Sequence, residues 1–272
     1  LLGSATNISG TSAATTFLNT GSLVLGNAAS DTLTFAGGLT ATTPTAISAA
    51  GAIGTAGTTN AAIVLGSAPV TLTGNTVFSA GSGAISLGGT VDGAYSLALN
   101  STGVTTLSNT LGDSAALISV TTNAGGTLVM NGAVVKTTGA QSYGEAVTLG
   151  ANTTLTSTGA GDIRFDGTLN GAKTLNVNTA GVTRFNAAVG DTTPLTSVTT
   201  DAVGTVLIQG GSVTTSGTHT YNDAMTLGAH TRLTSGSGTL NFLSITDGAS
   251  SFDLQLSSAT ALTLGDVDIG AR

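Results

Sequence analysis

The residues of this chain that could do chemistry are few, and the densest group of them lies between positions 162 and 186. Asp162, Arg164 and Asp166 alternate along the segment "DIRFD", and Arg184 lies 20 positions after Arg164 (184 − 164 = 20). A repeat with this step should place Arg164 beside Arg184 and Asp166 beside Asn186. Carboxylates and guanidinium groups that converge in this way could hold a sugar or Ca²⁺, or cleave a polysaccharide. The sequence favours the alternative interpretation, a solvated strand face whose charges confer solubility.

A second pair of carboxylates lies further along the sequence. Asp266 and Asp268, in "GDVDIG", fall on one face of a strand, where they could bind a cation. A solvated face is again the favoured interpretation. The segment "GAGDIRFDG" has some likeness to a calcium-binding nonapeptide, but it occurs once, and such motifs act in tandem copies. Asp162, Asp166, Asp266 and Asp268 are therefore weak candidates for a metal site, and no cofactor is predicted.

Histidine and cysteine offer little for catalysis or for zinc binding. The sequence contains two histidines, His219 and His230, and no cysteine, so a zinc site is not expected. In the long repeat described below the two histidines replace Gln141 and Asn152, and this substitution predicts a tolerant surface position for each. The sequence also lacks a nucleophile elbow, a Walker A motif and a dinucleotide-binding motif. It predicts no catalytic residue and no enzymatic activity.

The tyrosines could stack on sugars, but the repeat indicates another role for two of them. Tyr143 and Tyr221 occupy equivalent positions, where neighbouring copies of a shorter repeat carry Phe165 and Phe185. This equivalence predicts packing in the core or at a corner.

The composition restricts the class of protein that carries these residues. Charged residues make up 7% of the 272 residues, apolar residues make up 40%, and 40 residues are Gly. Low charge with high apolar content argues against disorder, and Thr with Gly favours strands joined by turns. The net charge is −7 and the six basic residues are scattered, so nucleic acid is not an expected partner. No apolar run reaches the roughly 18 residues that span a bilayer, so membrane insertion is not expected.

Internal repetition is the strongest signal in the sequence. The segments "LISVTTNAGGTLVMNGAVVKTTGAQSYGEAVTLG" and "LTSVTTDAVGTVLIQGGSVTTSGTHTYNDAMTLG" begin 78 positions apart, at Leu117 and Leu195 (195 − 117 = 78). The repeat predicts a diverged copy over residues 1–68, clearer copies over 69–146 and 147–224, and a partial copy over 225–272.

A shorter step runs inside the long repeat. Leu155, Phe165 and Leu169 recur 20 positions later (175 − 155 = 20) as Leu175, Phe185 and Val189. Stretches such as "TLNVN" and "VTRF" alternate apolar with polar residues, the pattern of half-buried strands. A coil of this length cannot bury its apolar side alone, but stacked coils share one continuous core.

We therefore predict that residues 1–272 form a single all-β solenoid segment, a right-handed parallel β-helix with almost no helix. It should have about 11 to 13 coils of roughly 20 to 23 residues each. The residues predicted to point inward are Leu87, Leu107, Leu155, Phe165, Leu175, Phe185, Leu227 and Leu233.

The alternative fold is a string of immunoglobulin-like sandwich modules, since the long repeat is near the size of one such domain. Three features argue against it. The shorter step has no counterpart in a Greek-key sandwich, the chain lacks Trp and Cys, and no composition break separates the copies.

The runs "TLTSTGAGDIRFDGTLNGAKTLNVNTAGVTRFNAAVG" and "GGSVTTSGTHTYNDAMTLGAHTRLTS" resemble the tandem repeats of filamentous-haemagglutinin-like and autotransporter-type bacterial surface proteins. The resemblance extends over residues 70–240. It implies a right-handed parallel β-helix and an extracellular or cell-surface rod. The family's N-terminal secretion domain is not visible in this sequence, and the resemblance carries over no catalytic residue.

The expected function is structural or adhesive: a surface or secreted adhesin stalk, or a building block of a fibre or sheath. The alternative is a β-helix that binds or cleaves polysaccharide through Asp162, Arg164, Asp166 and Arg184. Because neither end of the sequence shows a polar cap, the expected partners are flanking coils of a longer chain or identical subunits end to end. Cell-surface glycans and host or matrix proteins are further candidate partners.

Overall fold

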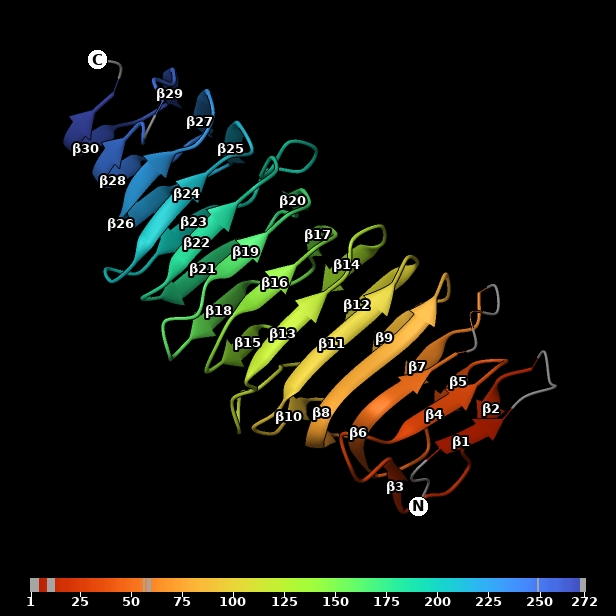
Figure 1. The fold of residues 1–272 in the computed structure, drawn as a ribbon. Helices are drawn as coiled ribbons and strands as arrows, with labels where there is room; N and C mark the ends of the chain where they lie inside the picture. Colours follow the sequence, from red (N-terminus) through yellow and green to blue (C-terminus); the bar gives the residue numbers. More distant parts are fainter. Residues whose placement is uncertain (1–4, 9–12, 56, 58–59, 249, 270–272) are drawn as a thin grey trace. The chain divides into compact units, whose positions relative to one another are not determined.

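The structure is a computed structural model that describes residues 5–8, 13–55, 57, 60–248 and 250–269. Every regular element among these residues is a β-strand (Figure 1). The described part accordingly contains no helix that could cross a bilayer. The chain divides into two compact units, residues 1–137 (unit 1) and residues 138–272 (unit 2).

Unit 1 is built from short parallel strands that stack coil upon coil. One ladder runs through β2, β5, β7, β9, β12 and β14, and others join β3 and β4 to β6, β6 to β8, β8 to β11, and β11 to β13. The strands are β1 (Ala5–Ile8), β2 (Thr15–Thr16), β3 (Ser22–Leu25), β4 (Thr32–Phe35), β5 (Leu39–Ala41), β6 (Ala46–Gly54), β7 (Ile63–Leu65), β8 (Val70–Gly81), β9 (Ile85–Leu87), β10 (Val91–Asp92), β11 (Ser96–Ser101), β12 (Val104–Leu107), β13 (Ser119–Thr122), β14 (Thr127–Met130) and β15 (Val134–Thr137).

Unit 2 has the same construction. Its longest ladder runs through β16, β19, β22, β24, β26, β28 and β30, and all of these pairings are parallel. The strands are β16 (Gln141–Tyr143), β17 (Ala146–Leu149), β18 (Thr153–Ser157), β19 (Ile163–Phe165), β20 (Leu169–Asn170), β21 (Thr174–Thr179), β22 (Val182–Phe185), β23 (Ser197–Thr200), β24 (Thr205–Ile208), β25 (Ser212–Thr215), β26 (His219–Leu227), β27 (Thr231–Ser235), β28 (Leu240–Thr246), β29 (Leu254–Ser258) and β30 (Leu262–Asp268).

The register of these ladders gives the length of a coil. In unit 1, Leu65 pairs with Leu87, Leu87 with Leu107, and Leu107 with Met130. The differences between the paired numbers are the coil lengths (87 − 65 = 22, 107 − 87 = 20, 130 − 107 = 23). All four side chains are buried. Stacking therefore places each apolar residue over its counterpart in the preceding coil, and the coils share a continuous core.

The fold predicted from the sequence is confirmed: the described residues form an all-β parallel solenoid of about 11 turns. All eight residues predicted to point inward are buried. Immunoglobulin-like sandwiches are excluded, because the strand pairings are parallel and join neighbouring coils. The right-handed coil and the continuity of residues 1–272 as one segment stay predictions.

Aromatic rings form a stacked column inside unit 2. The ring centroids of Tyr143 and Phe165 lie 5.1 Å apart with an interplanar angle of 25°, and those of Phe165 and Phe185 lie 5.6 Å apart at 10°. Tyr221 and Phe242 repeat the arrangement at 5.5 Å and 11°. Parallel strands are about 4.8 Å apart, so in-register rings meet face to face. The predicted core packing of Tyr143 and Tyr221 is confirmed.

Serine and threonine hydroxyls at strand ends of unit 2 also join adjacent coils, in two pairs: Ser157 lies beside Thr179, and Ser235 lies beside Ser258. Each hydroxyl donates to a glycine carbonyl one coil earlier, which satisfies a polar group that the coil buries or partly buries. The hydrogen bonds join Ser157 with Gly139 at 2.8 Å, Thr179 with Gly161 at 2.7 Å, Ser235 with Gly217 at 2.7 Å and Ser258 with Gly238 at 3.0 Å.

Two glycines that recur in the long repeat are required by the backbone. Gly112 and its counterpart Gly190 have φ angles of +70° and +69°. A Cβ atom at Gly190 would also collide with the carbonyl oxygen of Thr214 in the next coil. Other side chains rarely adopt this conformation, so the turn explains why glycine occurs in both copies.

Candidate functional site

A polar groove of about 430 Å³ lies on the surface of unit 2. It contains three of the charged residues that the sequence singled out between positions 162 and 186, namely Asp162, Arg164 and Arg184. The residues that line this arginine–aspartate groove are Ala140, Gln141, Ser142, Asp162, Arg164, Arg184, Asn186 and Gln209.

Strand alternation positions the two arginines of the groove. Phe165 on β19 and Phe185 on β22 point into the core, so Arg164 and Arg184, one residue earlier on each strand, point outward. The parallel register pairs Arg164 directly with Arg184. The predicted neighbourhood of the two arginines is therefore confirmed.

Each arginine is held by a different aspartate. Arg164 Nε donates to Asp166 Oδ2 at 2.9 Å, and Arg164 Nη2 contacts the same oxygen. Arg184 Nε donates to Asp162 Oδ2 at 3.2 Å. Asp166 lies two residues after Arg164, whereas Asp162 lies two residues before it. The two guanidinium groups are therefore drawn in opposite directions along the strands.

The two carboxylates are fixed in turn by the adjacent coil. Asp162 Oδ1 accepts a hydrogen bond from the backbone N–H of Val182 at 2.9 Å. Asp166 Oδ1 accepts one from Asn186 Nδ2 at 2.7 Å, so the predicted proximity of Asp166 and Asn186 is confirmed. Asp166 does not line the groove itself but lies beside it, paired with Arg164. Two positive and two negative side chains are thus held in and beside the groove, and their charges balance.

Several polar groups of the groove face solvent without an internal partner. The side chains of Arg164 and Arg184 are 48% and 34% exposed. Within the described part of the chain no hydrogen bond occupies Arg164 Nη1, either Nη atom of Arg184 or the side-chain amide of Gln209. These N–H groups are available to a bound molecule.

Behind the groove, Gln141 ties the surface to the core. Its Nε2 donates to the carbonyl of Thr156 at 3.0 Å, and its Oε1 accepts from the hydroxyl of Tyr143 at 2.9 Å. Gln141 is buried even though it lines the groove. Burial raises the pKa of Tyr143, so its hydroxyl remains a hydrogen-bond donor.

His219, the counterpart of Gln141, contradicts the prediction of a tolerant surface position. It is fully buried, with Nε2 3.0 Å from the carbonyl of Thr234 and Nδ1 3.2 Å from the hydroxyl of Tyr221. Burial lowers the pKa of His219 to about 4, although the Thr234 carbonyl acts in the opposite direction. His and Gln exchange because both offer two polar atoms to the same two kinds of partner.

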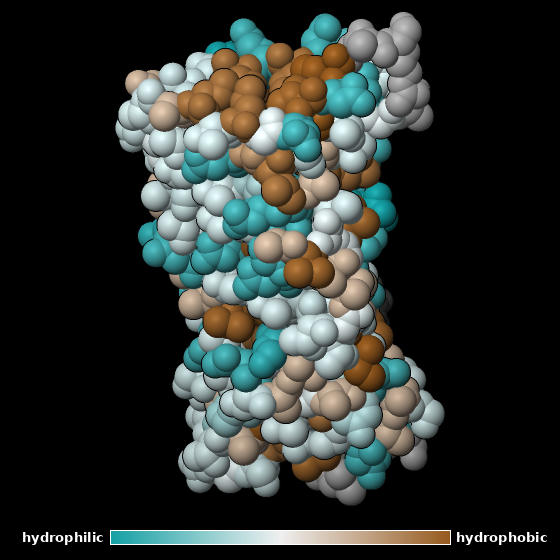
Figure 2. All heavy atoms as spheres, turned by 90° about the vertical axis from the view of Figure 1, so that its left-hand side faces the viewer, coloured by the Kyte–Doolittle hydropathy of each residue, from teal (hydrophilic) through white to brown (hydrophobic). Residues whose placement is uncertain are grey.

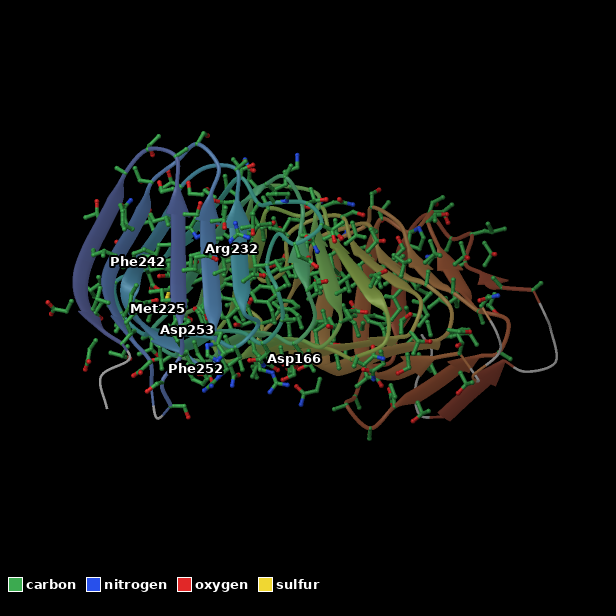
Figure 3. The ribbon with its side chains drawn as sticks, turned by 90° about the horizontal axis from the view of Figure 1, so that it is seen from above. Asp166, Met225, Arg232, Phe242, Phe252 and Asp253 are labelled. Carbon is green, nitrogen blue, oxygen red and sulfur yellow. The ribbon has the colours of Figure 1, made fainter. Side chains whose placement is uncertain are left out.

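His230 lies at the surface, as predicted. Its side chain is 70% exposed, Nδ1 lies 3.1 Å from Asp253 Oδ2, and the ring meets Phe252 edge-on. Figure 3 labels Phe252 and Asp253 of this surface together with Asp166, which lies beside the groove. His219 is therefore buried and His230 exposed. The sequence did not indicate this difference, because the long repeat predicted a surface position for both.

The second predicted pair of carboxylates does not join the groove. Asp266 and Asp268 lie exposed on β30, paired with Ser244 and Thr246 of β28. Among the described residues no three His, Cys, Asp or Glu side chains gather to hold a metal ion.

Sequence reasoning missed two buried acids. Asp223 and Glu145, its counterpart in the preceding copy of the long repeat (223 − 145 = 78), are both buried at a corner of the coil. Burial is the main cause that raises the pKa of Asp223 to about 6; the charge of Asp201 adds to it and the Thr200 hydroxyl opposes it. The sequence held one signal, since Gly167 stands at the matching place in the coil after Glu145 and has no side chain to fill the corner.

The C-terminal coil of unit 2 presents a second surface, which is apolar. Leu240 and Ile245 on β28 are fully buried, whereas their paired residues on β30, Leu262 and Val267, are 45% and 41% exposed. Leu264 on the same strand is 44% exposed. Apolar residues gather at the top of the view in Figure 2. Apolar side chains at the core-facing positions of β30 are therefore open to solvent.

Together, the fold and the groove define a parallel β-solenoid with a charge-balanced polar surface site. Comparison with family models, curated proteins and solved structures finds no match to this chain. Of what the resemblance to filamentous-haemagglutinin-like repeats implies, the structure shows the parallel β-solenoid fold alone.

Proposed function

We propose that this chain is a structural and adhesive rod at a bacterial cell surface or in the extracellular space. It would serve as an adhesin stalk or as a building block of a fibre or sheath. The observation that carries the proposal is the uninterrupted stack of in-register coils. Tyr143, Phe165, Phe185, Ile208 and Leu227 follow one another in paired positions through five successive strands of unit 2.

A stack of this kind can be lengthened by the addition of further coils. In a solenoid each coil contacts only its neighbours, so length grows without a change in cross-section. The buried rings, leucines and hydroxyls of each coil need only the coil before and the coil after. A rod of this kind holds surface groups, such as the arginine–aspartate groove, at a fixed distance from an anchor.

The apolar C-terminal coil supports end-to-end assembly. Leu262, Leu264 and Val267 are exposed, whereas the paired core residues of β28 are covered by β30. A further coil would bury them and would pair with the edge of β30. We propose flanking coils of a longer chain or an identical subunit as that partner, with glycans or host and matrix proteins as partners of the lateral surface.

Electron cryo-tomography of the cells that produce the protein tests the proposal. An epitope tag is inserted beside Val203, which is 62% exposed in the loop between β23 and β24. We expect the label along fibres, stalks or a sheath outside the cell. A label confined to the cytoplasm would contradict the proposal. Rods of fixed length would indicate one long polypeptide, whereas rods without a fixed length would indicate stacked subunits.

The second candidate function is polysaccharide cleavage, which is favoured by Asp162 in the groove and by Asp166 beside it. Its test is the incubation of the purified chain with an acidic polysaccharide, followed by measurement of new chain ends. Cleavage that is lost in Asp166→Asn, while the variant melts at the same temperature, would replace the scaffold proposal with an enzymatic one.

A further inference from the structure

The polar groups of the arginine–aspartate groove restrict the class of ligand that the groove could bind. We infer that it binds an uncharged saccharide through adjacent hydroxyl groups. This inference deepens the proposed adhesive role and rests on it, because it names the class of molecule to which the rod would attach.

Hydrogen-bond donors and acceptors lie next to each other in and beside the groove. The free N–H groups of Arg164 and Arg184 lie beside the carboxylates of Asp162 and Asp166, whose oxygens can each accept more than one hydrogen bond. A sugar hydroxyl donates one hydrogen bond and accepts others, so it can bridge a carboxylate and a guanidinium group. Two neighbouring hydroxyls would engage both ion pairs at once, and Gln209 adds an amide at the edge of the groove.

Charge balance favours an uncharged ligand over an anionic one. Each guanidinium group of the groove already contacts a carboxylate, so no net positive charge remains to attract an acidic sugar. The chain as a whole has a net charge of −7, which repels polyanions at long range. An anion would also have to compete with Asp162 and Asp166 for the same N–H groups.

The groove is organised before any ligand binds. Asp162 is held by the Val182 N–H and Asp166 by Asn186, and the two strands that carry the arginines are locked by the stack of Phe165 on Phe185. Side chains that are already ordered lose little conformational entropy on binding.

The experiment is binding of the full chain to an array of immobilised oligosaccharides. The array carries neutral hexose and N-acetylhexosamine oligomers beside uronic-acid and sulfated oligomers. We expect binding to one or more neutral oligomers, with a fall of roughly 10-fold or more in Arg184→Gln, because a hydrogen bond from a charged donor is lost. Arg232→Gln is the matched control, since Arg232 lies on β27 in a different sheet of unit 2. This variant should bind the oligosaccharides like the parent chain.

A loss of binding must be distinguished from a loss of folding. Exposed ion pairs contribute little to stability, so Arg184→Gln should stay folded, and its melting temperature verifies this. If Arg184→Gln unfolds, Gln209→Ala takes its place, because that side chain makes no internal hydrogen bond among the described residues. Absence of saccharide binding, binding to acidic oligomers alone, or equal binding by the groove variants and Arg232→Gln would overturn the inference. The location of the rods by tomography is independent of all three results.

Discussion

At the residue scale, Asp223 shows how the solenoid tolerates a charge inside its corner. The register of β26 shifts between Tyr221 and Ala224, and Asp223 lies within that irregularity. Its side chain is buried, and among the described residues neither carboxylate oxygen has a well-formed hydrogen bond. A carboxylate in this position is poorly solvated, so its protonated form is favoured.

The raised pKa of Asp223 predicts a stability that falls as the pH rises. In the unfolded chain the pKa is 3.8, and in the folded chain it is about 6. The contribution of Asp223 to the free energy of unfolding is therefore fully present below about pH 4 and is lost as the pH rises through about 6. Asp223→Asn should raise the free energy of unfolding at pH 8 by an amount on the order of 2 kcal/mol, with little change at pH 4. Denaturant titration at the two pH values measures this.

Asp268→Asn is the matched control for that experiment, because Asp268 is exposed on β30. It should change the stability by less than about 0.5 kcal/mol at both pH values. An Asp223→Asn variant that is no more stable than the parent chain at pH 8 would contradict the prediction.

His219 predicts the opposite dependence on pH. Its folded pKa of about 4 lies below the usual value of 6.5, so its contribution is present above pH 6.5 and is lost as the pH falls towards 4. His219→Gln should keep the melting temperature at pH 7, because Gln141 makes the same two contacts in the equivalent coil. Between pH 6.5 and pH 4 the variant should lose less stability than the parent chain.

Thermal melts across that pH range provide the measurement, with His230→Gln as the control. His230 is 70% exposed, so its replacement should leave the acid profile unchanged. Equal acid profiles for His219→Gln and the parent chain would show that His219 does not titrate from a buried state.

At the scale of single elements, β19 and β22 show how a core position and a surface site depend on each other. Phe165 and Phe185 stack inside while Arg164 and Arg184 pair outside, and one register sets both. Loss of a ring would leave a cavity directly beneath the groove.

Phe165→Ala should therefore lower the free energy of unfolding by about 3 to 5 kcal/mol, the range seen when a buried aromatic side chain is removed. Leu243→Ala is the control of the same kind, because Leu243 is 56% exposed and should change stability by less than about 0.5 kcal/mol. Guanidinium chloride titration measures both variants. Equal midpoints for the two would show that Phe165 is not packed in the core.

Sequence spacing predicted much of the groove because of this same register. In a parallel stack, residues one coil apart become neighbours, so the shorter repeat step placed Arg164 beside Arg184 and Asp166 beside Asn186 correctly. The partner of each arginine could not be predicted in this way. Arg184 reaches back to Asp162 of the preceding coil rather than to a residue of its own coil, and that choice depends on side-chain rotamers.

At the scale of the whole molecule, the apolar C-terminal coil of unit 2 predicts self-association. Leu262, Leu264 and Val267 would be buried by another coil, and apolar burial contributes about 25 cal/mol per Å². Leu264→Lys should weaken association, because stacking would bury its charge. Sedimentation velocity over a range of concentrations should show larger species for the parent chain than for this variant.

Thr263→Lys is the control, because Thr263 is adjacent on β30 and its side chain points to the opposite face of the strand. It should associate like the parent chain. A parent chain that sediments as a monomer at every concentration would contradict self-association through this coil.

The sequence by itself determined the repeating coil, its length and the identity of its core residues. These properties follow from spacing alone, since a short period with alternating apolar residues has few ways to bury them other than stacking. The tertiary structure alone decided which polar residues are buried. Gln141, His219, Glu145 and Asp223 look like surface residues in the sequence, because polar type predicts exposure on average. Their burial depends on which atoms the adjacent coil brings within hydrogen-bond distance, and that is a property of the packed coils and not of the period.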